Sequence, residues 1–183
     1  SAMLYGFDIA DSFIQTGKAE CVLIIACEAM SKQLDWSDRG TCVLFGDGAA
    51  AAVLKKGDGL LGQCLACVPN GKTIFTPAFE GASPFSTREA RKVALNMDGK
   101  ETYKFAVNVM VEQMEKVLEK AGLTVNDIDY VLPHQANIRI IDAAKKRFNI
   151  PDEKVLTNIS SYGNMSATSI AVLLDENARS GKF

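Results

Sequence analysis

The chain has 183 residues, of which 48% are hydrophobic, and a formal net charge of -2. This is a soluble globular composition, with enough apolar surface for one core or for two small halves that share one. The balanced charge gives no basis for nucleic-acid binding, and no apolar run is long enough to cross a bilayer. The five cysteines are an odd number without disulfide-like spacing, so we expect a protein of the reducing cytoplasm.

The first third of the chain alternates between helical and strand-like patterns. Residues 4–15 carry a helical apolar stripe that Gly17 closes. The unbroken apolar run at 21–27 is rich in β-branched residues, which predicts a strand covered on both faces. Residues 42–45 and 49–54 predict two strands joined by a tight Gly-Asp-Gly turn.

The apolar pattern of the first part of the chain is interrupted at Gly57 and Gly59. We therefore place a boundary here, between residues 1–58 and residues 59–183. Cys64 and Cys67 form a CxxC pair just beyond it. We interpret them as structural cysteines in a strand, and predict no metal site, because no second ligand pair accompanies them.

The second part begins with a loop-like stretch at 70–90 and continues with amphipathic patterns. The elements expected after it are a long helix at 101–121, a short strand at 129–132, a helix at 136–148, a strand fragment at 155–156 and a helix at 166–178. Helices that alternate with apolar strands indicate an α/β layered architecture with a largely parallel sheet.

Two polar residues, His134 and Asn164, stand where an apolar run gives way to a turn and then to a helix. Proteins of the α/β class place their chemistry at such points, beside helix N-termini. The imidazole N–H and the amide N–H₂ are both donors that can stabilise an oxygen gaining negative charge. Taken singly, a histidine at a strand end is ordinarily a structural residue and an asparagine after glycine a turn residue. Because His134 is the only histidine, mechanisms that need two are excluded.

Five segments resemble the signatures of one enzyme family, in the family's order. They are residues 35–41, 44–49, 97–101, 134–141 and 162–169. The family is β-ketoacyl-acyl-carrier-protein synthase III, of the thiolase superfamily, and the resemblance covers essentially the whole chain. It implies a thiolase-like layered αβαβα fold, truncated at both ends. Residues 1–58 would end the N-terminal half, and residues 59–183 would form an incomplete C-terminal half.

The resemblance implies a decarboxylating Claisen condensation of acyl-CoA with malonyl-acyl-carrier-protein, which initiates fatty acid synthesis without a cofactor. His134 and Asn164 would stabilise the enolate that forms as carbon dioxide leaves. The related elongating synthases use two histidines, so a single histidine favours the initiating branch. The family's nucleophilic cysteine would stand immediately before Ser1, so we expect the chain as given to be inactive. The first three residues are either a cloning remnant or native sequence that follows this cysteine.

The resemblance also implies binding residues. Arg39 and Trp36 match positions at the adenine end of coenzyme A, and Gly99 and Asn137 match positions that line the pantetheine tunnel. Basic residues match the docking patch for acyl carrier protein, although a solvated basic helix face is the plainer reading. These docking candidates are Arg139, Lys146, Arg147 and Lys104.

We further expect the full-length protein to be a homodimer with residues 21–27 near its interface, and to bind neither nucleic acid nor membrane. Two other functions stay open at this point. One is a non-catalytic fragment that keeps carrier-protein binding or dimer contacts. The other is a related ketosynthase of specialised metabolism that uses a longer acyl-CoA.

Overall fold

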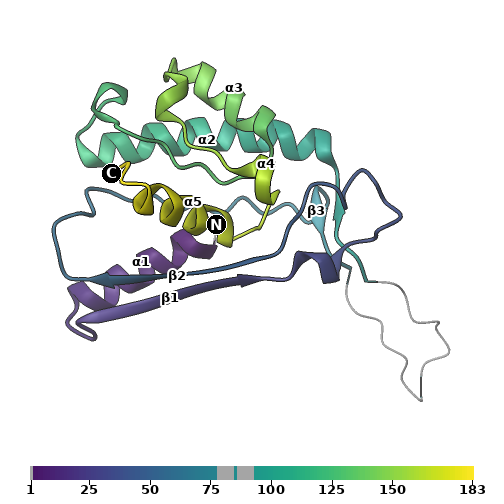
Figure 1. The fold of residues 1–183 in the computed structure, drawn as a ribbon, viewed down its shortest axis with the longest axis horizontal. Helices are drawn as coiled ribbons and strands as arrows, with labels where there is room; N and C mark the ends of the chain where they lie inside the picture. The colour runs from purple at the N-terminus through teal and green to yellow at the C-terminus, as the bar shows by residue number, and fades with distance from the viewer. Residues whose placement is uncertain (1, 78–84, 86–92) are drawn as a thin grey trace.

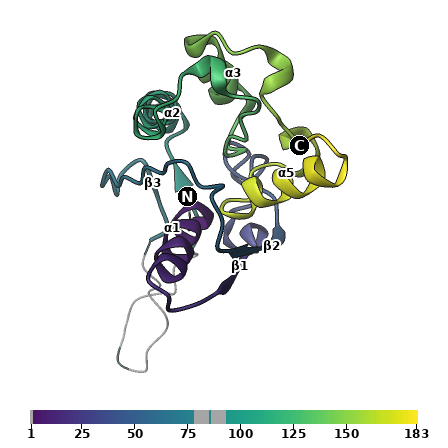
Figure 2. The ribbon, with the colours of Figure 1, turned by 90° about the vertical axis from the view of Figure 1, so that its left-hand side faces the viewer.

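The computed structural model describes residues 2–77, 85 and 93–183, so part of the loop predicted at 70–90 lies outside the described residues. The principal elements form three layers, with a sheet on one side, a helix pair against it and a second helix pair beyond (Figures 1 and 2). They are β1 (Cys21–Glu28) and β2 (Gly48–Lys55), then α1 (Ala2–Gln15) and α5 (Thr168–Arg179), then α2 (Gly99–Ala121) and α3 (Ile138–Phe148).

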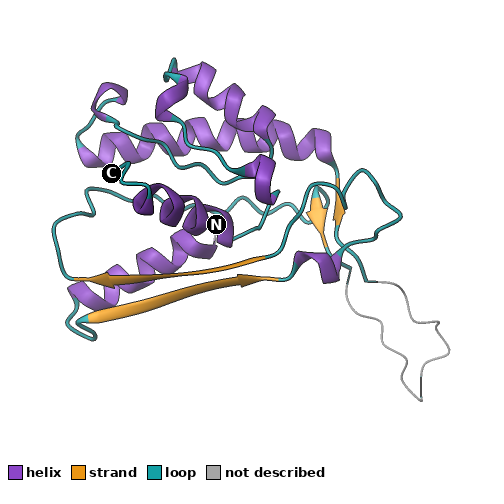
Figure 3. Cartoon of the chain, in the orientation of Figure 1, coloured by secondary structure: helices purple, strands orange, loops and turns teal. Residues whose placement is uncertain are grey.

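Short elements connect these layers (Figure 3). They are η1 (Met30–Gln33), β3 (Ile74–Phe75), β4 (Asn96–Met97), η2 (Val125–Asp127), η3 (Asp152–Lys154) and α4 (Ile159–Tyr162). The helix α4 is not among the predicted elements, because four residues are too few to show a helical period. It matters for function, since it lies just before Asn164.

The β1–β2 sheet buries only one of its faces. On the inner face Ala26 joins Met3 of α1 and Ala171 of α5 in a buried cluster. Small residues allow this close approach, since a Cβ on Gly6 of α1 would lie 3.0 Å from Ile24 Cγ2. The two helices and the sheet therefore form one packed unit.

The outer face of the sheet is apolar and exposed. Leu23, Ile25 and Val53 keep 58%, 66% and 66% of their surface in contact with solvent. Strand residues alternate between faces, and the described chain supplies helices to one face only. The prediction that the run 21–27 is covered on both faces is therefore wrong for this chain.

The predicted strand pairing is also wrong. The expected hairpin of 42–45 with 49–54 does not form, because residues 41–44 are turns and β2 pairs antiparallel with β1. The small β3–β4 sheet is antiparallel too. Parallel pairing among the described residues is confined to two isolated bridges, Phe45 with Asn164 and Val131 with Val155. Alternating patterns locate strands but do not report their partners.

Helix boundaries follow recognisable caps. The Asp98 carboxylate accepts from the backbone N–H of Lys100 and Glu101 at the start of α2, and Gly122 ends that helix with φ 67°. The α3 helix starts at Ile138 because the Asn137 side chain accepts from the Arg139 N–H. Cys64 and Cys67 lie in irregular chain, which corrects their predicted placement in a strand.

Candidate active site

His134 follows a two-residue parallel bridge that fixes its segment. The Val131 N–H donates to the Lys154 carbonyl at 2.8 Å, and the Leu156 N–H donates to the Val131 carbonyl at 3.0 Å. This bridge is what forms where the sequence predicts strands at 129–132 and 155–156. Pro133 has no N–H to donate to a strand ladder, so the pairing ends there. His134 therefore lies just beyond the paired residues.

The His134 ring is largely buried, and its Nδ1 atom has no hydrogen-bond partner in the described part of the chain. Burial disfavours the charged imidazolium and lowers the pKa of His134 from 6.5 to about 4. At neutral pH the ring is therefore uncharged. A neutral imidazole keeps one N–H and can donate one hydrogen bond.

The Asn164 backbone is held by the segment that precedes β2. Its N–H donates to the Leu44 carbonyl at 2.9 Å, and its carbonyl accepts from the Gly46 N–H at 3.0 Å. Its side-chain Oδ1 accepts from the Ser166 N–H at 2.9 Å. Because the oxygen end of the amide serves the backbone, the Nδ2 group is the end left to donate to a ligand.

The close packing of the Asn164 segment against residues 44–46 accounts for the glycines of the Gly-Asp-Gly segment better than a hairpin turn does. A Cβ on Gly46 would lie 2.1 Å from the Tyr162 carbonyl oxygen, so only glycine permits the approach. The Asp47 carboxylate accepts from the Ser31 N–H at 2.7 Å and from its hydroxyl. These bonds hold the pKa of Asp47 below its usual range. The segment thus ties Asn164 to η1, which follows β1.

A polar network joins the two candidate segments. The Gln135 side chain is fully buried and bonds to the backbone of both segments. The Glu176 carboxylate on α5 accepts from Asn158 Nδ2 at 2.8 Å and from the Tyr162 hydroxyl at 2.5 Å. Sequence reasoning missed Gln135, Asn158 and Glu176. Gln135 stands inside the motif around His134, and that position was its only available signal.

The predicted coenzyme A residues lie apart from this network. Trp36 is 64% exposed and Arg39 is exposed, on a turn where Asp38 Oδ1 accepts from the Gly40 N–H at 3.0 Å. Among the described residues, no hydrogen bond joins Trp36 or Arg39 to the His134 segment. Gly99 is the exposed first residue of α2, and Asn137 is the N-cap of α3.

The predicted docking residues lie on two helices that pack together, α2 and α3. Arg139, Lys146 and Arg147 are exposed on α3. Lys104 on α2 pairs with Glu101 at 2.8 Å, which raises the pKa of Lys104. Its charge is partly matched within its own helix, so the α3 residues are the stronger candidates for a partner.

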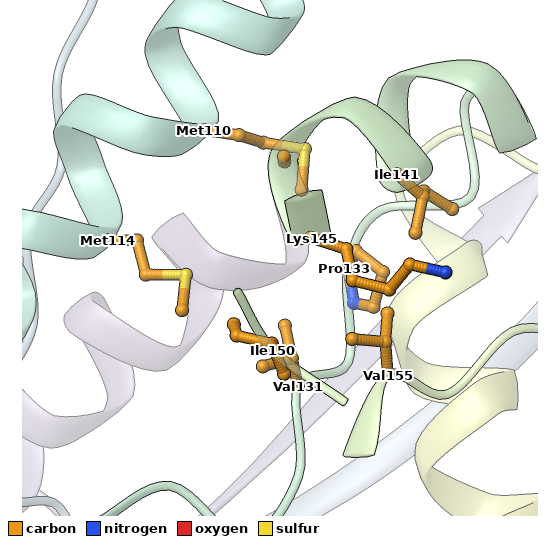
Figure 4. A pocket seen from close by; sticks show the side chains of 9 residues that line it. Met110, Met114, Val131, Pro133, Ile141, Lys145, Ile150 and Val155 are labelled. Atoms are coloured by element: carbon orange, nitrogen blue, oxygen red, sulfur yellow. The ribbon is translucent and has the colours of Figure 1, made fainter. Parts of the chain in front are cut away.

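A small cavity lies between α2 and α3, beside Pro133 (Figure 4). It measures about 10 Å³, and apolar groups line nearly all of it, Met110, Met114 and Ile141 among them. A space of this size is at the lower limit for one water molecule, so it is a packing gap and not a substrate pocket. Within the described residues no cluster of three or more His, Cys, Asp or Glu side chains could hold a metal ion. Nor does any helix there have the length and apolar content to span a membrane.

Two family profiles match the chain. The profile described as 3-oxoacyl-[acyl-carrier-protein] synthase III matches residues 1–67, and its C-terminal counterpart matches residues 118–183. Two curated relatives are both named β-ketoacyl-[acyl-carrier-protein] synthase III. The protein from Caldanaerobacter subterraneus is 47% identical over 99% of this chain and 56% of the relative. The protein from Desulfitobacterium hafniense is 48% identical over 100% of this chain and 57% of the relative.

A solved structure gives the same result. The synthase III from Thermus thermophilus superposes with a TM-score of 0.89 at 40% identity, over 99% of this chain and 57% of that protein. The predicted thiolase-like α/β fold class is therefore confirmed. The chain spans a little more than half the length of the relatives it matches.

Proposed function

The chain belongs to the 3-oxoacyl-[acyl-carrier-protein] synthase III family, and we propose that it carries the His/Asn part of such an enzyme's active site. The proposed reaction is the decarboxylating condensation of acyl-CoA with malonyl-acyl-carrier-protein in the initiation of fatty acid synthesis. The observation that carries the proposal is a pair of donors: a neutral His134 ring and an Asn164 amide whose oxygen is already bonded.

The donors would act on one step. In the malonyl thioester, the bond to the carboxylate carbon breaks and carbon dioxide leaves. The electron pair of that bond stays on the thioester fragment, which becomes an enolate with negative charge on the thioester oxygen. Donors aimed at that oxygen stabilise the charge as it develops. The enolate carbon then attacks the acyl thioester on a cysteine thiol, which leaves as thiolate.

Neutrality of the histidine suits this role. A charged imidazolium beside the malonyl carboxylate would stabilise the ground state, whereas a neutral N–H strengthens its bond chiefly as the enolate forms. The buried ring, with its pKa near 4, stays neutral across the physiological range. The proposed His134 role is therefore hydrogen-bond donation and not proton transfer.

The binding assignments are part of the same proposal. Arg39 and Trp36 would meet the adenine end of coenzyme A, for which an exposed guanidinium and indole are suited. Gly99 and Asn137 would line the pantetheine path. The exposed basic face of α3, with Lys104 beside it, would dock an acidic acyl carrier protein. We also propose a cytoplasmic homodimer, with residues 1–58 and 59–183 in its two thiolase-like halves.

The experiment is carbon dioxide release from malonyl-acyl-carrier-protein by the full-length enzyme that carries this chain. We expect His134→Ala and Asn164→Ala each to lower the rate by about 10²- to 10³-fold, the usual cost of one oxyanion donor. Asn126→Ala, at an exposed asparagine in η2, is the matched control and should keep the rate. Unchanged decarboxylation by His134→Ala would refute the enolate role.

A further inference from the structure

Gln135 is a buried polar side chain whose hydrogen bonds all run to the backbone. Its residue has 0% exposure. Its Nε2 donates to the Pro133 carbonyl at 2.8 Å, and its Oε1 accepts from the Asn158 N–H at 3.0 Å and the Ile159 N–H at 3.1 Å. A buried amide of this kind is expensive to place unless it is fully bonded, so the arrangement holds both partners firmly.

The first bond closes a small ring around His134. The side chain of residue 135 reaches back to the carbonyl of residue 133, and the Ala136 N–H donates to the His134 carbonyl at 2.9 Å. The backbone on both sides of the histidine is therefore fixed by local bonds. This fixes the direction in which the imidazole leaves the chain.

The other two bonds reach the segment that ends in Asn164. Asn158 and Ile159 open α4, which ends at Tyr162, and Gly163 with φ 67° then turns the chain into Asn164. Glu176 on α5 holds the same helix from the other side through Asn158 and Tyr162. One amide thus bonds both segments, and α4 carries its position to the asparagine.

We propose that Gln135 is a positioning residue, which sets the placement of His134 relative to Asn164 by joining the Pro133 carbonyl to the first N–H groups of α4. The inference rests on the proposed function, because the two donors matter only if they share one oxygen. Gln135 itself touches no reacting atom. Misplacing a donor by about 1 Å costs on the order of 10²-fold in rate, so the residue matters to catalysis without taking part in it.

Two substitutions separate this role from simple packing. Gln135→Met keeps the volume but removes all three bonds. Gln135→Glu keeps the shape, and its protonated carboxyl reproduces the pattern: the O–H donates to the Pro133 carbonyl and the other oxygen accepts from α4. Its ionised carboxylate cannot donate, and it opposes the Pro133 carbonyl. Gln15→Met, at an exposed glutamine of α1, is the matched control.

Rate and pH profile give the first readout, in the full-length enzyme between pH 5 and pH 8. His134 stays neutral over this range; Glu176 and Tyr162, the titratable groups on the network, are common to wild type and variants. Gln135→Met should lower kcat for decarboxylation by at least tenfold at every pH, with KM within about threefold of wild type. The Gln135→Glu rate relative to wild type should be highest at pH 5 and fall as pH rises.

The ring of the only histidine gives a second readout that needs no activity. In this chain labelled with ¹⁵N-histidine, wild type should show one set of His134 ring signals. Gln135→Met should shift or double them, and Gln135→Glu should match wild type at pH 5 only. In Gln135→Met, amide exchange at Asn158 and Ile159 should be faster than in wild type, while exchange in α2 stays unchanged.

The outcomes that overturn the inference are distinct from those that overturn the proposed function. The positioning role is refuted if Gln135→Met has wild-type kcat. It is also refuted if the rate of Gln135→Glu relative to wild type is the same at pH 5 and pH 8. Full activity in His134→Ala sinks the proposed function instead. In that case the ring signals and amide exchange still decide whether Gln135 positions His134.

Discussion

The junction of the His134 and Asn164 segments and the outer face of the β1–β2 sheet differ in how far the chain completes them. At the junction, backbone and side-chain hydrogen bonds between separate stretches of the chain hold the His134 and Asn164 segments in place. On the outer face, Leu23, Ile25 and Val53 lie bare. The polar arrangement that the chemistry needs is thus set by contacts within the chain, while the apolar outer face of the sheet is left uncovered by the described residues. The hydrogen-bonded site and the hydrophobic cover of the sheet are therefore separable properties of this fold.

The largest effect is expected from Gly46→Ala, which breaks the junction. The new Cβ would lie 2.1 Å from the Tyr162 carbonyl oxygen and push the Asn164 segment away. We expect a loss of about 3–5 kcal/mol in the free energy of unfolding, the range of severe steric substitutions. Urea denaturation measures it. Gly57→Ala, where no atom lies within 4 Å, is the control, and an equal loss in both would contradict the account.

The second largest effect is expected from acid, which should lower the free energy of unfolding through His134. The pKa of His134 is about 4 in the folded chain and 6.5 when exposed, so the unfolded chain takes up the proton first. Stability from the neutral ring is therefore fully present above pH 6.5 and lost as pH falls toward 4. The loss amounts to at most about 3 kcal/mol. Urea denaturation at pH 7 and pH 4.5 should show a smaller drop in His134→Gln than in wild type; equal drops would contradict the burial.

The exposed basic face of α3 should matter for binding and not for stability, unlike the junction. In the full-length enzyme, Arg139→Ala and Lys146→Ala should leave stability unchanged. If α3 docks the carrier protein as proposed, each should raise KM for malonyl-acyl-carrier-protein about twofold to fivefold, the worth of an exposed charge contact. The effect should shrink with added salt. Lys116→Ala, whose charge is paired with Glu112, is the control. A KM that responds equally to all three changes argues against a docking face.

The smallest effect is expected on the bare face of the sheet. Leu23→Thr and Val53→Thr should change the free energy of unfolding of this chain by no more than about 0.5 kcal/mol, because neither side chain is packed. Ile24→Thr, the neighbour that faces α1, should cost more, about 1–3 kcal/mol. Thermal denaturation distinguishes them. Similar losses at Leu23 and Ile24 would show that the outer face is covered after all.

Sequence reasoning located the helices well, since caps such as Asp98 and Gly122 are local signals. It misplaced the strand partners, because whether β2 pairs with residues 42–45 or with β1 depends on packing against α5, far along the chain. His134 and Asn164 were visible through their motifs. The roles of Gln135 and Glu176 were not, because a glutamine or glutamate acquires its partners only when separate segments meet.

The bridge between Phe45 and Asn164 also bears on how the molecule folds. Closing so long a loop costs chain entropy before the contact returns any stabilisation, so pairings of this kind form late. The Leu44 and Gly46 bonds that hold Asn164 therefore depend on both ends of the chain having already collapsed. A partly folded molecule can hold α2 and α3 together and still have no site, and the Asn164 contacts should form after helical structure when the protein refolds.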